Sequence, residues 1–150
     1  MKLATALSER SDLQRRMSEL SGRLNQNAKV QEGEKPAEDP QALLAELNEI
    51  LGQLEALIAR INLTNSATKV GVLTLTELLA RRDCLKSRIQ ILRSFLDSAS
   101  ARVERYSRTE IKINSTVKVR DLQTELDGYS KQLRELDEQI QELNWTTELL

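Results

Sequence analysis

Apolar residues recur along the chain at alternating intervals of three and four residues, which is the spacing of a helix with one apolar seam. The first such series predicts a helix over about residues 2–27. One member of this series, Arg10, is charged. The full series is Leu3, Ala6, Arg10, Leu13, Met17, Leu20 and Leu24.

A second helix is predicted over about residues 40–65. Asp39 is suited to cap it, and Pro40 suits the first helical position because proline has no N–H to leave unsatisfied there. Its apolar face is wide enough for two neighbours, so we expect this helix to be the most buried. The seam is Leu44, Leu47, Leu51, Leu54, Ile58 and Ile61, widened by Leu43, Ile50 and Leu57.

Two further series predict helices over about residues 75–106 and 119–144. Thr74 and Glu77 are spaced as a capping box at the start of the third helix. The third series again contains one charged residue, Arg82, whereas the fourth has no break. The series are Leu75, Leu78, Arg82, Leu85, Ile89, Leu92, Leu96, Ala99 and Val103, and then Val119, Leu122, Leu126, Tyr129, Leu133, Leu136, Ile140 and Leu143.

The connection before the fourth helix has a different pattern. Ile111, Ile113 and Val117 alternate with polar residues, which favours a short strand or extended segment over about residues 109–117. A strand needs a ladder partner. Residues 69–73 could supply it within the chain, the same strand of another subunit could supply it between chains, or the segment could simply cover the end of the helices.

These elements predict an all-α fold in a single helical domain over residues 1–150. Helices of this length are not stable alone in water, so they must pack on each other. We expect an antiparallel four-helix bundle made of two coiled-coil hairpins. The alternative is an open hairpin that another subunit completes.

Composition excludes several kinds of chemistry. The chain has no histidine and a single cysteine, Cys84, so imidazole catalysis, an intrachain disulfide and a multi-thiolate zinc site cannot be built. No glycine-rich phosphate loop occurs, and we expect no catalytic residues, no metal and no cofactor. Cys84 itself is expected to be a buried or half-buried apolar residue. Without an export signal or a long apolar run, we expect a cytoplasmic protein.

Charge is distributed unevenly along the chain. Residues 102–120 contain six basic and two acidic residues, although the whole chain has a net charge of −1. This stretch is a candidate contact for an anion or a partner, and a solvated helix face is the competing interpretation. The overall acidity speaks against specific nucleic-acid binding. The candidate contact residues are Arg102, Arg105, Tyr106, Arg108 and Lys112.

Arg10 and Arg82 are unusual because an unpaired buried guanidinium is costly. One interpretation is that they pair with acidic residues such as Asp12, Asp83 or Glu77 and set the register of the helices. The other is an internal polar pocket shared with Asn62 and Asn65.

Four segments of the chain resemble those of a small bacterial family labelled septicolysin-like. They are residues 27–33 (NAKVQEG), 36–40 (PAEDP), 105–112 (RYSRTEIK) and 144–149 (NWTTEL). The resemblance implies a bacterial origin and a similar length, with no established activity. The cytolysin label implies membrane activity as an alternative function.

The sequence therefore predicts a protein without enzymatic activity that self-associates and acts through protein–protein contacts. It is expected to be a homo-oligomer, with an unidentified protein as a further partner and without nucleic-acid or membrane contacts. The alternatives are a membrane-active protein, and an enzyme or ligand binder whose site lies between subunits.

Overall fold

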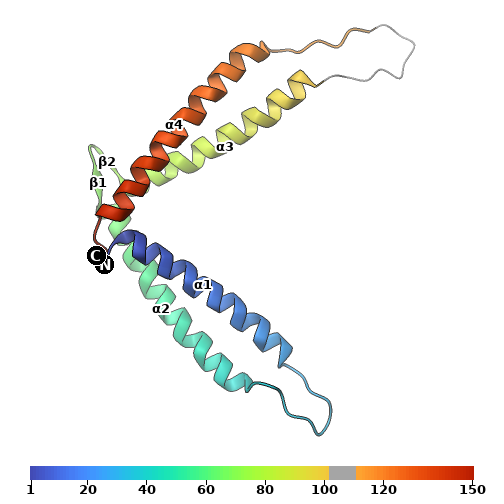
Figure 1. Cartoon of the computed structure of the whole chain (residues 1–150), viewed down its shortest axis with the longest axis vertical. Helices are drawn as coiled ribbons and strands as arrows, with labels where there is room; N and C mark the ends of the chain where they lie inside the picture. The colour runs from blue at the N-terminus through green and yellow to red at the C-terminus, as the bar shows by residue number, and fades with distance from the viewer. Residues whose placement is uncertain (102–110) are drawn as a thin grey trace. The chain divides into compact units, whose positions relative to one another are not determined.

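The computed structural model describes residues 1–101 and 111–150. It contains four helices, α1 (Leu3–Gln26), α2 (Pro40–Ala67), α3 (Leu75–Ser100) and α4 (Val119–Thr146), and two short strands, β1 (Lys69–Val70) and β2 (Leu73–Thr74) (Figure 1). The all-α class and the four helices are confirmed, and the helices pack in pairs. The third helix was predicted over residues 75–106; α3 ends at Ser100, and residues 102–106 lie outside the described residues. The chain divides into two compact units, residues 1–75 with 141–150, and residues 76–140.

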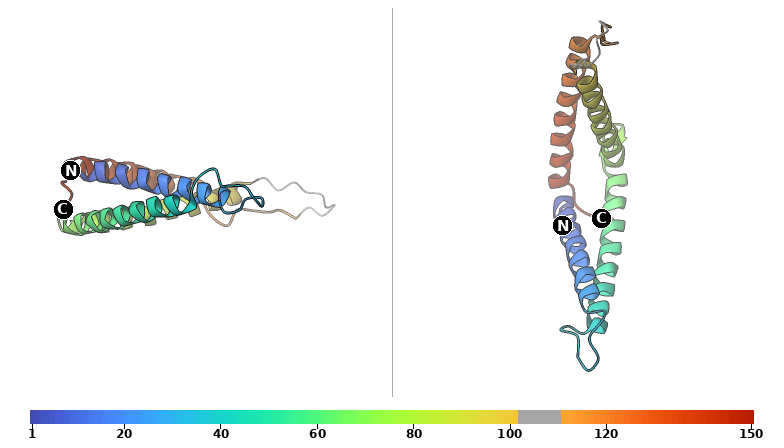
Figure 2. Two further views of the ribbon diagram at one scale, coloured as in Figure 1. Left: turned by 90° about the horizontal axis from the view of Figure 1, so that it is seen from below. Right: turned by 90° about the vertical axis from the view of Figure 1, so that its right-hand side faces the viewer.

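In the first unit, α1 and α2 form an antiparallel hairpin and lie side by side along their lengths (Figure 2). Asp39 caps α2 as predicted, since its carboxylate accepts a hydrogen bond from the Gln41 N–H at 3.1 Å. The buried residues are Leu3, Ala6, Leu13 and Leu20 of α1, and Leu43, Ile50, Leu54, Leu57, Ile61 and Thr64 of α2.

The predicted seam of α2 is partly wrong. Ile50 is only 2% exposed, whereas its neighbour Leu51, which the heptad spacing put in the seam, is 40% exposed. Leu44, seven residues before Leu51, is exposed to the same extent. The reason is that α1 covers only one of two adjacent apolar stripes on α2.

The loop between α1 and α2 is fixed at both ends by Asn27. The Asn27 amide donates a hydrogen bond to the Arg23 carbonyl at 2.8 Å, and its side-chain oxygen accepts one from the Glu38 N–H at 3.0 Å. Arg23 also forms a two-point ion pair with the Glu38 carboxylate. The two helix ends are therefore joined by polar contacts as well as by the apolar seam.

Replacing Asn27 by Ala should lower the free energy of unfolding by about 1–3 kcal/mol, because it leaves the part-buried Glu38 N–H without its acceptor. Urea unfolding monitored by circular dichroism measures the change. Asn25→Ala is the matched control, since Asn25 is exposed in the same turn and should change stability by less than about 0.5 kcal/mol. Equal effects of the two substitutions would contradict the role assigned to Asn27.

Glu38 should make stability depend on pH. The hydrogen bond from Arg23 is the main cause that holds the pKa of Glu38 below its ordinary value of 4.5. The folded state therefore gains from the ionised carboxylate above that pH, and this gain is lost as the pH falls through the lower pKa of the folded protein. We expect the stability difference between the wild type and Glu38→Gln to shrink between pH 7 and pH 3. Glu34→Gln, an exposed change in the same loop, is the control, and a difference that stays constant with pH would refute this assignment.

A tight hairpin joins α2 to α3. Lys69 pairs with Thr74 and Val70 with Leu73, which leaves Gly71 and Val72 as the two turn residues. Gly71 has a φ of 62°, and no residue other than glycine has a positive φ among those described, so the turn is of type II′. The pairing of residues 69–73 with residues 109–118 within the chain, one of the three alternatives, is therefore wrong. Residues 111–118 form no strand, and residues 109 and 110 lie outside the described part of the chain.

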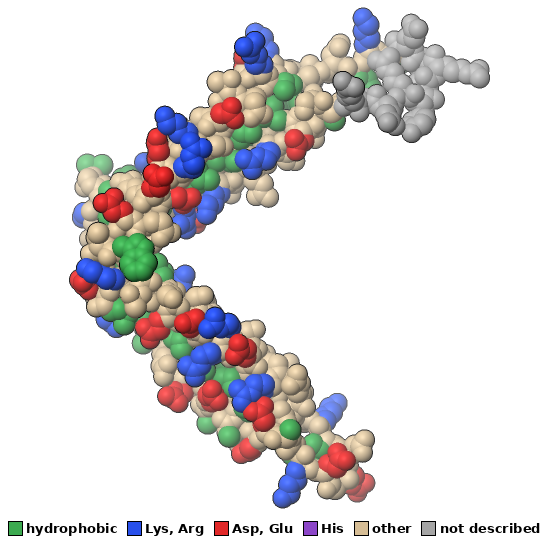
Figure 3. All heavy atoms as spheres, viewed as in Figure 1, with side chains coloured by type: hydrophobic (Ala, Val, Ile, Leu, Met, Phe, Trp, Pro, Cys, Tyr) green, Lys and Arg blue, Asp and Glu red, His purple; other side chains and the backbone are tan. Residues whose placement is uncertain are grey.

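The second unit is the antiparallel α3–α4 hairpin. Its buried contacts centre on Ile89 and Leu96 of α3 and Leu126 of α4. Around them, other seam residues are only half-buried, namely Leu85, Leu92, Val119, Leu122, Tyr129 and Leu133. Figure 3 shows acidic and basic side chains over both hairpins, with hydrophobic side chains between them.

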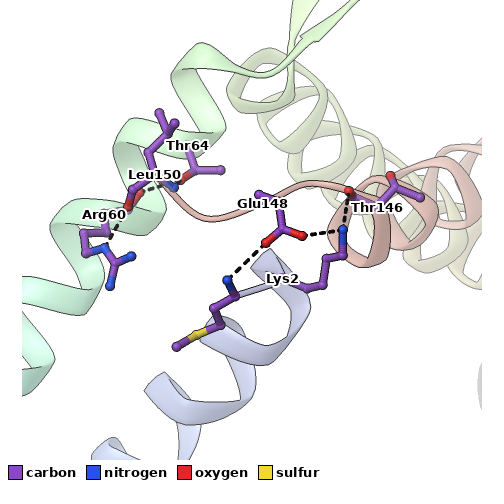
Figure 4. Close-up of polar contacts among 7 residues, drawn as sticks. Lys2, Arg60, Thr64, Thr146, Glu148 and Leu150 are labelled. Atoms are coloured by element: carbon purple, nitrogen blue, oxygen red, sulfur yellow. Dashed lines mark hydrogen bonds and ion pairs between the residues drawn. The ribbon is translucent and has the colours of Figure 1, made fainter.

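The C-terminal segment is bound to the start of α1 and the end of α2 (Figure 4). The Leu3 N–H donates a hydrogen bond to the Thr147 carbonyl at 2.9 Å, and the Lys2 ammonium lies 2.6 Å from the Glu148 carboxylate. That contact is the main cause of the lowered pKa of Glu148. On α2, the buried Thr64 hydroxyl accepts a hydrogen bond from the Leu150 N–H at 3.0 Å.

Candidate functional site

A groove runs along one face of the α3–α4 hairpin. Its first hollow has a volume of about 580 Å³ and is lined by Asp83, Cys84, Ser87, Arg88, Ile91 and Leu92 of α3 and by Glu125 and Tyr129 of α4. Its second hollow, of about 450 Å³, is lined by Arg81, Cys84, Leu85, Arg88, Gln132, Glu135, Leu136 and Gln139. Because Cys84 and Arg88 line both hollows, the two are parts of one surface, which we call the α3/α4 groove.

The groove exists because α3 has apolar residues on more than one face. Ile89 and Leu96 are buried against α4, whereas Ile91 is 68% exposed and Phe95 is 43% exposed. Ile91 and Phe95 are four residues apart, so they lie on the same side of the helix. The α3–α4 pair alone leaves this second stripe in contact with solvent.

Three polar side chains in the groove are linked to one another. The guanidinium carbon of Arg88 lies 5.0 Å from the centre of the Tyr129 ring, which is a cation–π contact. The Tyr129 hydroxyl donates a hydrogen bond to the Glu125 carboxylate at 2.9 Å. A basic and an acidic group are thereby held in the same hollow beside exposed apolar side chains.

Cys84 differs from its predicted environment. We expected a buried or half-buried thiol, and the structure places it exposed in the groove. The helical positions that face α4 are taken by neighbouring seam residues such as Leu85 and Ile89, so Cys84 lies beside the seam. It is therefore accessible to reagents.

Arg82 is half-buried in the second unit. Its Nε atom lies 3.5 Å from an oxygen of Asp83, one of the acidic partners considered from the sequence, and 4.0 Å from one of Asp137. Within the described residues this Nε has no hydrogen-bond partner. The nearby carboxylates therefore offset part of the cost of burying the guanidinium by charge attraction, without a hydrogen bond to Nε.

Arg10 is half-buried on α1 in the first unit, and its Nε atom is likewise buried without a hydrogen-bond partner among the described residues. Of the two asparagines proposed to share a polar pocket, Asn62 is exposed and Asn65 is half-buried near the end of α2. The structure shows no hydrogen bond between Arg10 and either asparagine in the part of the chain that it describes.

Replacing Arg10 by Leu should raise the free energy of unfolding by about 1 kcal/mol, because a seam position then holds an apolar side chain without a buried unsatisfied N–H. Thermal unfolding measures the change, with Arg15→Leu on the exposed face of α1 as the control. A loss of stability at Arg10 would instead favour its role in setting the register of the helices.

The predicted basic stretch is only partly described. Arg102, Arg105, Tyr106 and Arg108 lie outside the described residues, and Lys112 is exposed in the segment before α4. Within residues 1–101 and 111–150, no three His, Cys, Asp or Glu side chains are arranged to hold a metal ion. None of the helices in these ranges has the length and apolar character needed to cross a membrane.

Comparison with known proteins places the chain in a family without an assigned activity. The model of a family of unknown function (DUF6847) matches residues 10–149. The chain belongs to this family. The DUF6847 match does not test the septicolysin-like resemblance, which stays a prediction.

A crystal structure described as that of a functionally unknown conserved protein from Corynebacterium diphtheriae is similar over its full length. It is 43% identical to this chain, with a TM-score of 0.93, and the match covers 100% of this chain and 99% of the other. No curated protein matches the chain. The fold is therefore shared with this neighbour, and the function has to be argued from the surface of the molecule.

Sequence reasoning missed three residues of the site. Arg88 and Cys84 attracted no binding role from the sequence because neither is a seam residue of α3, and Glu125 is one of many surface carboxylates. The packing of α3 on α4 brings these three residues to one surface. The one sequence signal was the width of the apolar face, since Ile91 and Phe95 lie beside the main seam.

Proposed function

We propose that this protein is a non-enzymatic helical protein that self-associates and acts through protein–protein contacts. The observation that carries the proposal is the second apolar stripe on each hairpin. On α2 it includes Leu44 and Leu51, and on α3 it includes Ile91 and Phe95.

Both stripes are exposed in the single chain, and each lies next to a stripe that is buried within its own hairpin. Removing apolar surface from water contributes about 25 cal/mol per Å², so covering several such side chains would favour association. The side chains follow helical spacing, which suits the packing of another helix against them.

The experiment is a measurement of molar mass in solution by light scattering coupled to size exclusion, at two protein concentrations and two salt concentrations. A dimer or larger assembly is expected. A mass that stays at 17.0 kDa under all conditions would refute self-association. A pull-down with the same protein would then be needed to identify a different partner.

Membrane activity remains the alternative that the septicolysin-like resemblance implies. Leakage of a fluorescent dye from liposomes of neutral and anionic lipid tests it directly. We expect no leakage at concentrations where self-association is complete, and dose-dependent leakage would favour membrane activity. A cytoplasmic location is part of the main proposal, since the single Cys84 requires no oxidising compartment.

A further inference from the structure

We infer that the α3/α4 groove is the surface on which a second copy of this chain docks, with α3 of each copy lying over α4 of the other. The inference rests on the proposed self-association and specifies where and in which orientation it occurs. It uses the apolar stripe, the charges of the two helices and the order of residues along the groove.

The apolar contribution comes from side chains that a second hairpin would cover. Ile91 and Phe95 are exposed, and Leu85 and Leu92 are only half-buried along the groove. Two hairpins packed face to face would enclose these side chains between four helices. A second copy presents the same apolar side chains, so each copy would remove the other's from water.

The charges of the two helices are opposite in sign. α3 contains five basic and three acidic residues, whereas α4 contains three basic and seven acidic residues. A second copy therefore brings one basic and one acidic helix to a surface that also has one of each. Complementary charges of this kind fix the relative orientation of two partners.

Two symmetric arrangements place one hairpin face against another. If the two-fold axis runs across the helices, α3 packs on α3 and α4 on α4, so like charges meet. If the axis runs along the helices, α3 packs on α4 in both halves of the dimer, so opposite charges meet. Electrostatics selects the second arrangement.

The lining of the groove matches this second arrangement. Arg88 and Glu125 line the first hollow, and Arg81 and Glu135 line the second. An axis along the helices keeps each residue at its level, so Arg88 of one chain comes over the hollow that contains Glu125 of the partner subunit. In the same way, Arg81 comes over the hollow that contains Glu135 of the partner subunit.

A charge exchange tests the inference. Arg88→Glu and Glu125→Arg should each weaken self-association at least about tenfold, because each places like charges across the interface. An equimolar mixture of the two variants should recover dimers, since the pairs formed between chains are again opposite in sign. Recovery by mixing cannot come from contacts within a chain, because each chain in the mixture keeps its own altered charges.

Matched controls are available on the same helices. Lys86→Glu and Asp127→Arg change exposed charges two residues away, outside the lining of the groove, and should leave the mass unchanged. Circular dichroism verifies that every variant is folded. If the charge variants fail to fold, Ile91→Asp replaces them, with Val72→Asp at the 94% exposed turn as its control.

Cys84 supplies an independent measurement on the unaltered protein. Because it is the single cysteine and lies in the groove, its rate of reaction with a maleimide should fall as the protein concentration rises and dimers form. A wild type that stays monomeric refutes the proposed function. Two other results would keep self-association but refute the groove as its surface. In the first, the wild type associates and Cys84 reacts equally fast at every protein concentration. In the second, the mixture of the two charge variants forms no dimers.

Discussion

Replacing Ile50 by Ala should lower the free energy of unfolding of the α1–α2 hairpin by about 2–5 kcal/mol, the range for truncating a fully buried aliphatic residue. Ile50 lies in the middle of α2 among residues that face α1, and it is 2% exposed. The substitution removes three carbon atoms and leaves a cavity between α1 and α2 that the neighbouring side chains do not fill. Urea unfolding monitored by circular dichroism at 222 nm measures the loss.

The adjacent residue provides the control. Leu51→Ala removes the same number of carbon atoms from the same helix, but Leu51 is 40% exposed and should lose less than about 1 kcal/mol. A larger loss at Leu51 than at Ile50 would mean that the heptad assignment was right and that α1 packs on the other stripe of α2. Both variants are compared at a protein concentration where the wild type is monomeric, so that association adds to neither loss.

The helices could be predicted because their signals are local. The spacing of apolar residues gave all four helices, and Asp39 with Pro40 marked the start of α2 where the structure has it. The choice between Ile50 and Leu51 could not be made in the same way. Both belong to regular stripes on one helix, and only the position of α1 decides which stripe is buried.

The connections show a similar limit. Alternation at Ile111 and Ile113 predicted a strand, but a strand forms only where another segment completes its hydrogen bonds. Gly71 was the better signal, because glycine at the first position of a two-residue turn favours a hairpin within residues 69–74. The contact between Lys2 and Glu148 joins residues at opposite ends of the sequence and has no local signal.

The candidate site also depends on contacts between residues that are far apart in the sequence. Arg82 could be recognised as a charged residue in a seam, and the structure places its Nε atom in a buried position. Arg88 and Tyr129 are brought together only when α3 packs on α4 at a particular level. The groove therefore follows from the hairpin geometry and could not be located from helix periodicity alone.

Replacing Leu126 by Ala should lower the stability of the α3–α4 hairpin by about 2–5 kcal/mol. Leu126 is 4% exposed and forms the buried cluster of this unit with Ile89 and Leu96. Native-state hydrogen exchange measures the effect along the chain, because it reports the free energy of opening for separate segments. The loss should appear at amides of residues 76–140, since the buried contacts of Leu126 lie within that unit.

Leu122→Ala provides the control, because Leu122 is half-buried next to the same cluster and should produce a smaller loss in the same amides. If α1 and α2 keep their protection in Leu126→Ala, the two compact units open separately. An equal loss of protection at α1, α2, α3 and α4 would contradict this expectation and show that the chain unfolds as one cooperative domain. Hydrogen exchange thus decides whether residues 1–150 behave as the single domain predicted from the sequence.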